Sequence, residues 1–314
     1  MTAYVLRRIV AVIPVMAVVV TITFLLIHLI PGDPVSVMLG PDASPAQIQA
    51  TRAAMGLDRP LHEQLFTFYR RVLTADLGHS YFLDRPVTRA LAERAEPTIV
   101  LTLCALLVAV AIGVPSGIVA AAHRGSWWDR GLMFISLLGV CVPGFWLSLN
   151  FIFLFAVRLG WLPAAGYASV FSDPRTALTY MVLPAVSLGI NQSALIARIA
   201  RSCMLDVLRQ DYIRTANAKG LAPRVVTYVH AFRNALVPVV AVIGITTAIL
   251  IGGAVVTEIV FNIPGLGRLI ISAILRRDYP VVQGVVLVTA AAYVVINLVV
   301  DLLYAFIDPR IRYE

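Results

Sequence analysis

Residues 236–257 read LVPVVAVIGITTAILIGGAVVT and contain no charged side chain. A helix of about 20 mainly apolar residues is long enough to cross the hydrocarbon core of a bilayer. Similarly apolar stretches occur at residues 9–30, 98–122, 131–157, 180–200 and 282–306. The sequence therefore predicts an all-α membrane protein with six transmembrane helices.

The composition excludes several other classes of protein. The chain has 314 residues, of which 60% are hydrophobic and 13% charged, whereas soluble domains have roughly 45–50% apolar and about 25% charged residues. The net charge of +8 is not arranged as basic runs interleaved with aromatic residues, so nucleic acid is not an expected partner. Three cysteines without a C-x-x-C pair exclude a disulfide framework and a cysteine zinc site.

The arginines predict the orientation in the membrane. They gather in the N-terminal tail, in the second and fourth connections, and in the C-terminal tail at residues 307–314. Because cytoplasmic loops carry the excess of Lys and Arg, both termini are expected on the cytoplasmic side of the membrane. Residues 1–30 are interpreted as a tail and an uncleaved first span, because the helix stop at 31–34 includes no cleavage site.

Residues 31–97 are predicted to form a small helical subdomain outside the membrane. Residues 47–55 and 61–73 have helical patterns, and Ser44-Pro45 is typical of a helix start. Gly56 is expected to end the first of these helices. Two roles stay open from the residues alone: docking an external binding protein, or capping the pore.

Catalytic, cofactor and metal motifs are missing from the sequence. It has no H-E-x-x-H, G-x-S-x-G or phosphate-binding glycine pattern, so we expect neither enzyme activity nor ATP binding on this chain. The spans are nearly free of the ionisable groups that secondary carriers use for ion coupling. A stand-alone carrier or channel is nevertheless kept as an alternative, and a membrane scaffold or intramembrane enzyme as a third.

A few polar or small residues in the spans are candidates for lining a translocation pathway. Asn191 and Gln192 lie in the middle of the fourth span, where interhelical hydrogen bonding is the favoured alternative to a pathway role. The full candidate set is Asn191, Gln192, Thr246, Gly252, Gly253 and Glu258.

The connection between the fourth and fifth spans, residues 201–235, has the most informative pattern. Leu205, Leu208, Tyr212 and Ala216 recur at helical spacing. Gly220 then stands where a helix ends, and a proline three residues later begins a second helix. A short helix, a sharp turn and another helix suit a groove in a partner protein or contact with anionic lipid headgroups. Periodicity alone leaves both open.

Residues 212–221, YIRTANAKGL, resemble the EAA loop of ABC importer permeases. Ala216 matches the second alanine of that pattern and Gly220 matches its glycine. Arg214 and Thr215 depart from its first two residues. This variant resembles the dipeptide/oligopeptide/nickel subfamily. Further similar segments follow in the same order along the chain: residues 7–8 with 31–34, 56–61, 76–80, 160–163, 252–258, 261–268 and 277–280.

The resemblance implies a permease core at residues 98–306 that works with other chains. These are a second homologous permease subunit, one or two cytoplasmic ABC ATPase subunits that hold ATP and Mg, and an external substrate-binding protein, all at a lipid membrane. The substrate class implied first is a short peptide, with nickel chelates and glutathione as alternatives. For the turn at 264–267, an external gate, contact with the binding protein and a plain tight connection all stay open.

The resemblance also implies that the loop helix sits in a cleft of the ATPase. Arg214 is assigned to polar contact, Tyr212 and Ala216 to packing in the cleft, and Gly220 to the turn. The residues carried over to this coupling role are Asp211, Tyr212, Ile213, Arg214, Thr215, Ala216, Asn217, Lys219, Gly220 and Leu221.

Overall fold

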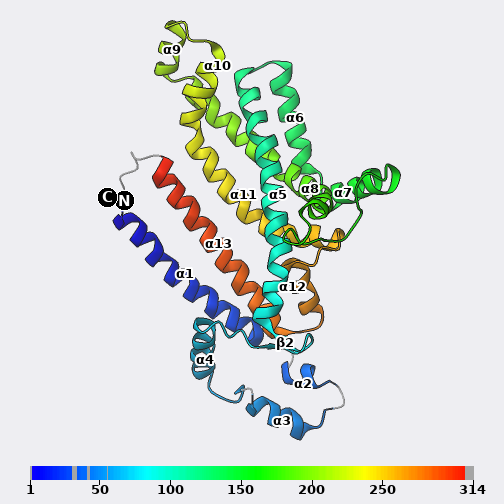
Figure 1. Ribbon diagram of the computed structural model, residues 1–314. Coiled ribbons are helices and arrows are strands. Elements are labelled where there is room, and N and C mark those ends of the chain that lie inside the picture. Colours follow the sequence, from blue (N-terminus) through cyan, green and yellow to red (C-terminus); the bar gives the residue numbers. More distant parts are fainter. Residues whose placement is uncertain (1, 30–33, 41–42, 55, 308–314) are drawn as a thin grey trace. The chain divides into compact units, whose positions relative to one another are not determined.

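The computed structural model describes residues 2–29, 34–40, 43–54 and 56–307 (Figure 1). Within them nearly all regular structure is helical, and the two strands form one short antiparallel pair, β1 (His79–Ser80) and β2 (Arg85–Pro86). The chain divides into two compact units. Unit 1 comprises Met1–Glu96 and Gly265–Val295, and unit 2 comprises Pro97–Pro264 and Ile296–Glu314.

The predicted class of an α-helical membrane protein is confirmed. Five helical segments within the described residues are long and apolar enough to cross a membrane. Most of them extend beyond the predicted spans, because the helices continue into polar turns at their ends. The segments belong to α1 (Thr2–Leu29), α5 (Val87–Ala122), α8 (Pro174–Leu208), the run of α10 (Pro223–Val225), η2 (Val226–Ala231) and α11 (Phe232–Val260), and α13 (Tyr279–Ile307).

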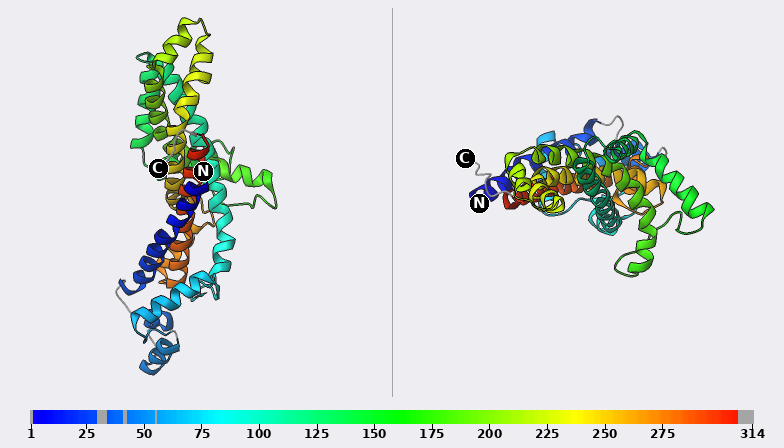
Figure 2. Two further views of the ribbon diagram at one scale, coloured as in Figure 1. Left: turned by 90° about the vertical axis from the view of Figure 1, so that its left-hand side faces the viewer. Right: turned by 90° about the horizontal axis from the view of Figure 1, so that it is seen from above.

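The third predicted span, residues 131–157, is not one straight helix. It consists of α6 (Trp127–Cys141), followed by α7 (Gly144–Phe151) with the π-helix η1 (Ile152–Arg158), and the two parts are bent by 99°. Proline disfavours the helical conformation of the residue before it, and Val142 is extended, with φ −78° and ψ 124°. The segment after the break turns away from α6 (Figure 2), so the third predicted span, when counted as one, is a broken span.

Unit 2 is organised around α8, which packs against α6, α7 and α11. Helix α8 also contacts α5 (Val87–Ala122) unusually closely, because glycines of each helix lie against the backbone of the other. A Cβ atom added at Gly113 of α5 would lie 2.7 Å from the carbonyl oxygen of Ser193, and one at Gly189 of α8 would lie 2.6 Å from that of Ala105. Small residues of this kind let membrane helices approach until their backbones touch.

In unit 1, the two helices predicted for the segment after the first span are confirmed. Residues Leu61–Leu73 form α4, and Pro45–Ala54 form α3. Ser44 and Gln47 bond to each other's backbone N–H groups, which is a capping-box arrangement at the start of α3. The predicted helix stop at residues 31–33 and most of the C-terminal tail lie outside the described residues.

Three elements of unit 1 were not expected from the sequence: α2 (Pro34–Leu39), the β1–β2 hairpin and α12 (Leu266–Leu275). A buried carboxylate joins two of them. Asp278, at the end of α12, accepts hydrogen bonds from the Ser80 hydroxyl and from the backbone N–H groups of Tyr81 and Phe82. Burial and this neighbouring carboxylate raise the pKa of Tyr81 to about 12. The hairpin is therefore fixed to the α12–α13 turn.

The close crossing of α5 and α8 makes a testable prediction about Gly113. A Gly113→Ala substitution is expected to destabilise the fold by about 1–3 kcal/mol, because the added methyl group meets a backbone that cannot move aside cheaply. Equilibrium unfolding of the detergent-solubilised chain in dodecyl sulfate, followed by tryptophan fluorescence, measures this change. Gly131→Ala in α6, where a Cβ meets nothing within 4 Å, is the matched control. Equal stability of the two variants would contradict the close crossing.

Candidate functional site

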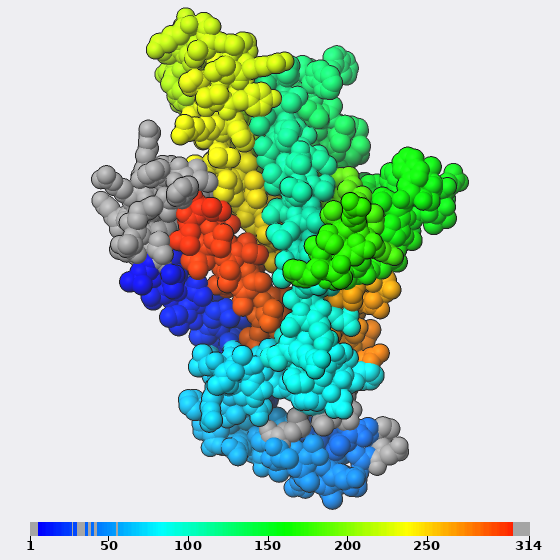
Figure 3. Space-filling view, in the orientation of Figure 1, coloured from blue at the N-terminus to red at the C-terminus, as the bar shows by residue number. Residues whose placement is uncertain are grey.

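The segment between α8 and α11 contains a short helix that two turns isolate. The first part of the 201–235 connection continues α8 as far as Leu208, and α9 (Asp211–Ala218) begins after an extended residue, Gln210. Beyond α9, Gly220 has a φ of +77°, a conformation that glycine adopts at little cost. Pro223 then opens α10. The structure thus places α9 and its turn at the surface (Figure 3).

The inner face of α9 is covered by the chain itself. Ile213 and Ala216 are 1% and 7% exposed and pack in a cluster that includes Met204 and Ala235. Ala216 therefore does not offer its side chain to a partner groove, in contrast to the expectation from the sequence. Helical periodicity shows which residues share a face, but it does not show which molecule covers that face.

The outer face of α9 is polar and solvent-exposed. We define it by the exposed residues Asp211, Tyr212, Arg214, Thr215, Asn217, Lys219 and Leu221. Tyr212 is 44% exposed, and the Arg214 guanidinium lies 3.4 Å from the Asp211 carboxylate in a fully solvated pair. Because exposed ion pairs contribute little, Arg214 keeps its capacity to bond elsewhere.

A charged pair that sequence reasoning missed fixes the end of α8 next to this helix. Arg201 donates two hydrogen bonds to Asp129 of α6, at 2.6 and 2.8 Å, and the two side chains are 27% and 6% exposed. The Asp129 carboxylate also accepts a hydrogen bond from the backbone N–H of Gly125. In the sequence, Ser126-x-x-Asp129 is typical of a helix start, but nothing there connects Asp129 to Arg201, 72 positions later.

The six pathway candidates differ in their surroundings. Asn191 donates to the carbonyl oxygens of Gly139 and Val142, at 2.9 and 3.2 Å, where α6 ends. Glu258 is fully buried and accepts a 2.6 Å hydrogen bond from Thr98. The others range from buried to exposed: Thr246 is buried, Gln192 and Gly253 are half-buried, and Gly252 is exposed. Their pathway role stays a prediction.

Several helices long and apolar enough to cross a membrane, with an exposed helix between the fourth and fifth of them when the broken span is counted, define a multi-pass membrane protein. The comparisons give its family. Residues 113–313 match the family described as "Binding-protein-dependent transport system inner membrane component", and residues 1–102 match the N-terminal region of such components. The chain therefore belongs to this family of ABC transporter permeases, and the resemblance found in the sequence is confirmed.

Individual relatives and a solved structure agree with this family. The chain is 44% identical to a dipeptide transport system permease protein of Alkalihalophilus pseudofirmus and 42% identical to a glutathione transport system permease protein of Salmonella choleraesuis, with complete coverage of both chains in each case. The MetNI methionine ABC transporter, solved in an inward-facing conformation, is similar in fold. The TM-score is 0.59 at 18% identity, covering 69% of this chain and 96% of that one.

The Asp129–Arg201 pair makes a second prediction. Arg201→Gln is expected to cost about 3 kcal/mol of stability, because it leaves a buried carboxylate without its main partner. Asp129→Asn is expected to cost less, since Arg201 is partly exposed. Unfolding free energies of both single variants and the double variant form a cycle, with a coupling of about 1–3 kcal/mol.

The control for this cycle is the exposed pair of Arg89 and Glu93 on α5, at 3.2 Å. Arg89→Gln is expected to change stability by less than about 0.5 kcal/mol. Additive effects at Asp129 and Arg201 would show that the two side chains do not stabilise each other.

Proposed function

We propose that this chain is the transmembrane permease subunit of an ABC importer that moves short peptides across the bacterial inner membrane. The observation that carries the proposal is its full-length similarity to dipeptide and glutathione permeases. Glutathione is itself a short peptide, so it is an alternative within one substrate class. A nickel importer of the same family is a second alternative, and a stand-alone carrier or channel would not need the helix α9.

The proposed energy source lies on other chains. Cytoplasmic ATPase subunits hold ATP and Mg, and the outer face of α9 docks on them through Tyr212, Arg214 and the turn at Gly220. Because Ile213 and Ala216 pack into the chain's own core, a movement of α9 is passed directly to α8 and α11. Such a packed helix is suited to act as a rigid lever.

The proposed topology places both termini in the cytoplasm and residues 31–97 outside. It rests on the distribution of Lys and Arg between the short connections. A second homologous permease subunit completes the pathway, and an external binding protein delivers the peptide. In this scheme the chain supplies the route and the coupling surface, and hydrolysis takes place elsewhere.

The turn at Gly220 provides a test of coupling. Gly220→Val is expected to abolish most peptide uptake, because a β-branched residue is strained at a φ of +77°. Gly220→Asn is the matched control and should retain uptake, since asparagine tolerates this conformation better than other residues. Uptake of a labelled dipeptide into cells, with membrane levels of each variant measured alongside, gives the comparison. Normal uptake by Gly220→Val would refute the role of the turn.

A pull-down of the complex from membranes in mild detergent tests the partners. Wild type is expected to bring down a homologous permease and at least one ATPase chain, identified by mass spectrometry. Arg214→Glu should lose most of the ATPase, because it reverses the charge of the outer face of α9. Arg175→Glu, at the opposite end of α8 and exposed, should retain it. A wild-type chain that purifies alone would favour the stand-alone carrier.

A further inference from the structure

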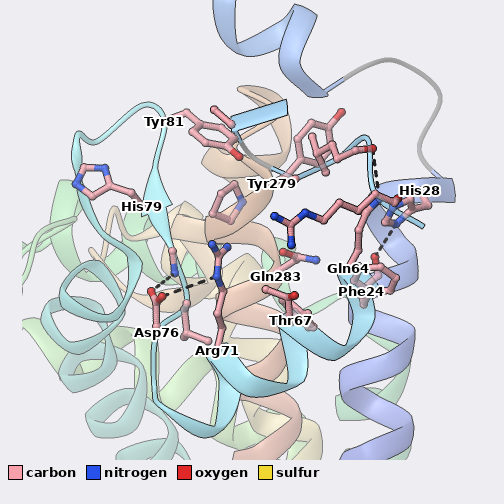
Figure 4. A pocket seen from close by; sticks show the side chains of 18 of the residues that line it. Phe24, His28, Gln64, Thr67, Arg71, Asp76, His79, Tyr81, Tyr279 and Gln283 are labelled. Atoms are coloured by element: carbon pink, nitrogen blue, oxygen red, sulfur yellow. Dashed lines mark hydrogen bonds and ion pairs between the residues drawn. The ribbon is translucent and has the colours of Figure 1, made fainter. Parts of the chain in front are cut away.

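Unit 1 contains a cavity of 610 Å³ that neither the sequence patterns nor the proposed coupling role explains (Figure 4). Its wall is formed by the end of α1, by α3 and α4, by the residues around β1, and by the start of α13. Cavities that hold small ligands usually measure about 300–1,000 Å³. The cavity is therefore large enough for a small organic molecule.

Two opposite charges stand together in the wall of this cavity. The Nε atom of Arg71 on α4 lies 3.9 Å from an Oδ2 atom of Asp76, and more than half of each side chain is exposed. An ion pair so long and so solvated is weak. Both groups therefore keep the capacity to bind stronger partners, an anion at Arg71 and a cation at Asp76.

Apolar rings complete the wall. Phe24 of α1 and Phe68 of α4 both line the cavity and contact each other, with ring centroids 5.8 Å apart. Arg59 also lines the cavity, so its wall carries two guanidinium groups and one carboxylate. A ligand that suits these groups carries a negative charge, a positive charge and an apolar part.

We propose that this cavity is an external binding site for the free zwitterion of a peptide of two or three residues. Arg71 binds its carboxylate, Asp76 binds its ammonium group, and Phe24 and Phe68 pack on its side chains. A dipeptide extends about 7 Å, which lets one molecule reach both charged side chains. The inference rests on the proposed function, because it takes the transported substrate as the ligand.

The test is equilibrium binding of a radiolabelled dipeptide to the full-length chain in lipid nanodiscs. Wild type is expected to bind it, whereas the same dipeptide with an acetylated N-terminus and an amidated C-terminus should bind at least about tenfold more weakly. Arg71→Gln and Asp76→Asn should each weaken binding about tenfold, because each removes a charged hydrogen bond. Arg70→Gln is the matched control, since Arg70 neighbours Arg71 on α4 but does not line the cavity.

Parallel uptake measurements on the complete importer separate failure of this site from failure of the proposed function. If the importer takes up dipeptide but the chain alone binds none, the cavity site is refuted and the proposed function stands. If the importer takes up no peptide of this class, the proposed function fails and the site fails with it. Unchanged binding in Arg71→Gln and Asp76→Asn would place the ligand elsewhere and overturn the assignment. Loss of binding-protein docking in these variants, with their dipeptide affinity unchanged, would also overturn the assignment. The cavity would then be a contact surface for that protein.

Discussion

The close approach of α5 and α8 is the contact on which the rest of unit 2 depends. Lipid tails are as apolar as the side chains they touch, so burying apolar surface gains little when two helices meet inside a bilayer. What remains is dispersion and polar contact, and both require short distances. Gly113 and Gly189 provide those distances, and α8 then offers its other faces to α6, α7 and α11.

This arrangement explains why α9 combines firm attachment with a free outer face. The cluster around Ile213 and Ala216 joins α9 to the ends of the spans, while the Asp129–Arg201 pair fixes α8 against α6 just before α9 begins. A docking surface on a loose loop would absorb a push from a partner. Under the proposed coupling, a push on α9 would reach α8 and α11 through packed side chains.

Local patterns were predictable from the sequence, and long-range ones were not. The boundaries of α4 and the cap of α3 were predicted because propensity and capping act within a few residues. The Asp129–Arg201 pair joins residues 72 positions apart, which no periodicity can reveal. The coupling role proposed for residues 211–221 comes from their resemblance to a family pattern. Which face of α9 is exposed was not predicted correctly, because the chain itself covers Ala216.

The break between α6 and α7 has a consequence for movement of the protein. Helix α6 ends with carbonyl oxygens that its own backbone cannot satisfy, and the Asn191 amide bonds to two of them, at Gly139 and Val142. Straightening the segment would take the carbonyls away from this amide and leave polar groups unsatisfied at membrane depth. Asn191 thus braces the break against straightening, and a transport cycle that rearranged these helices would have to break its two hydrogen bonds before the 99° bend could change.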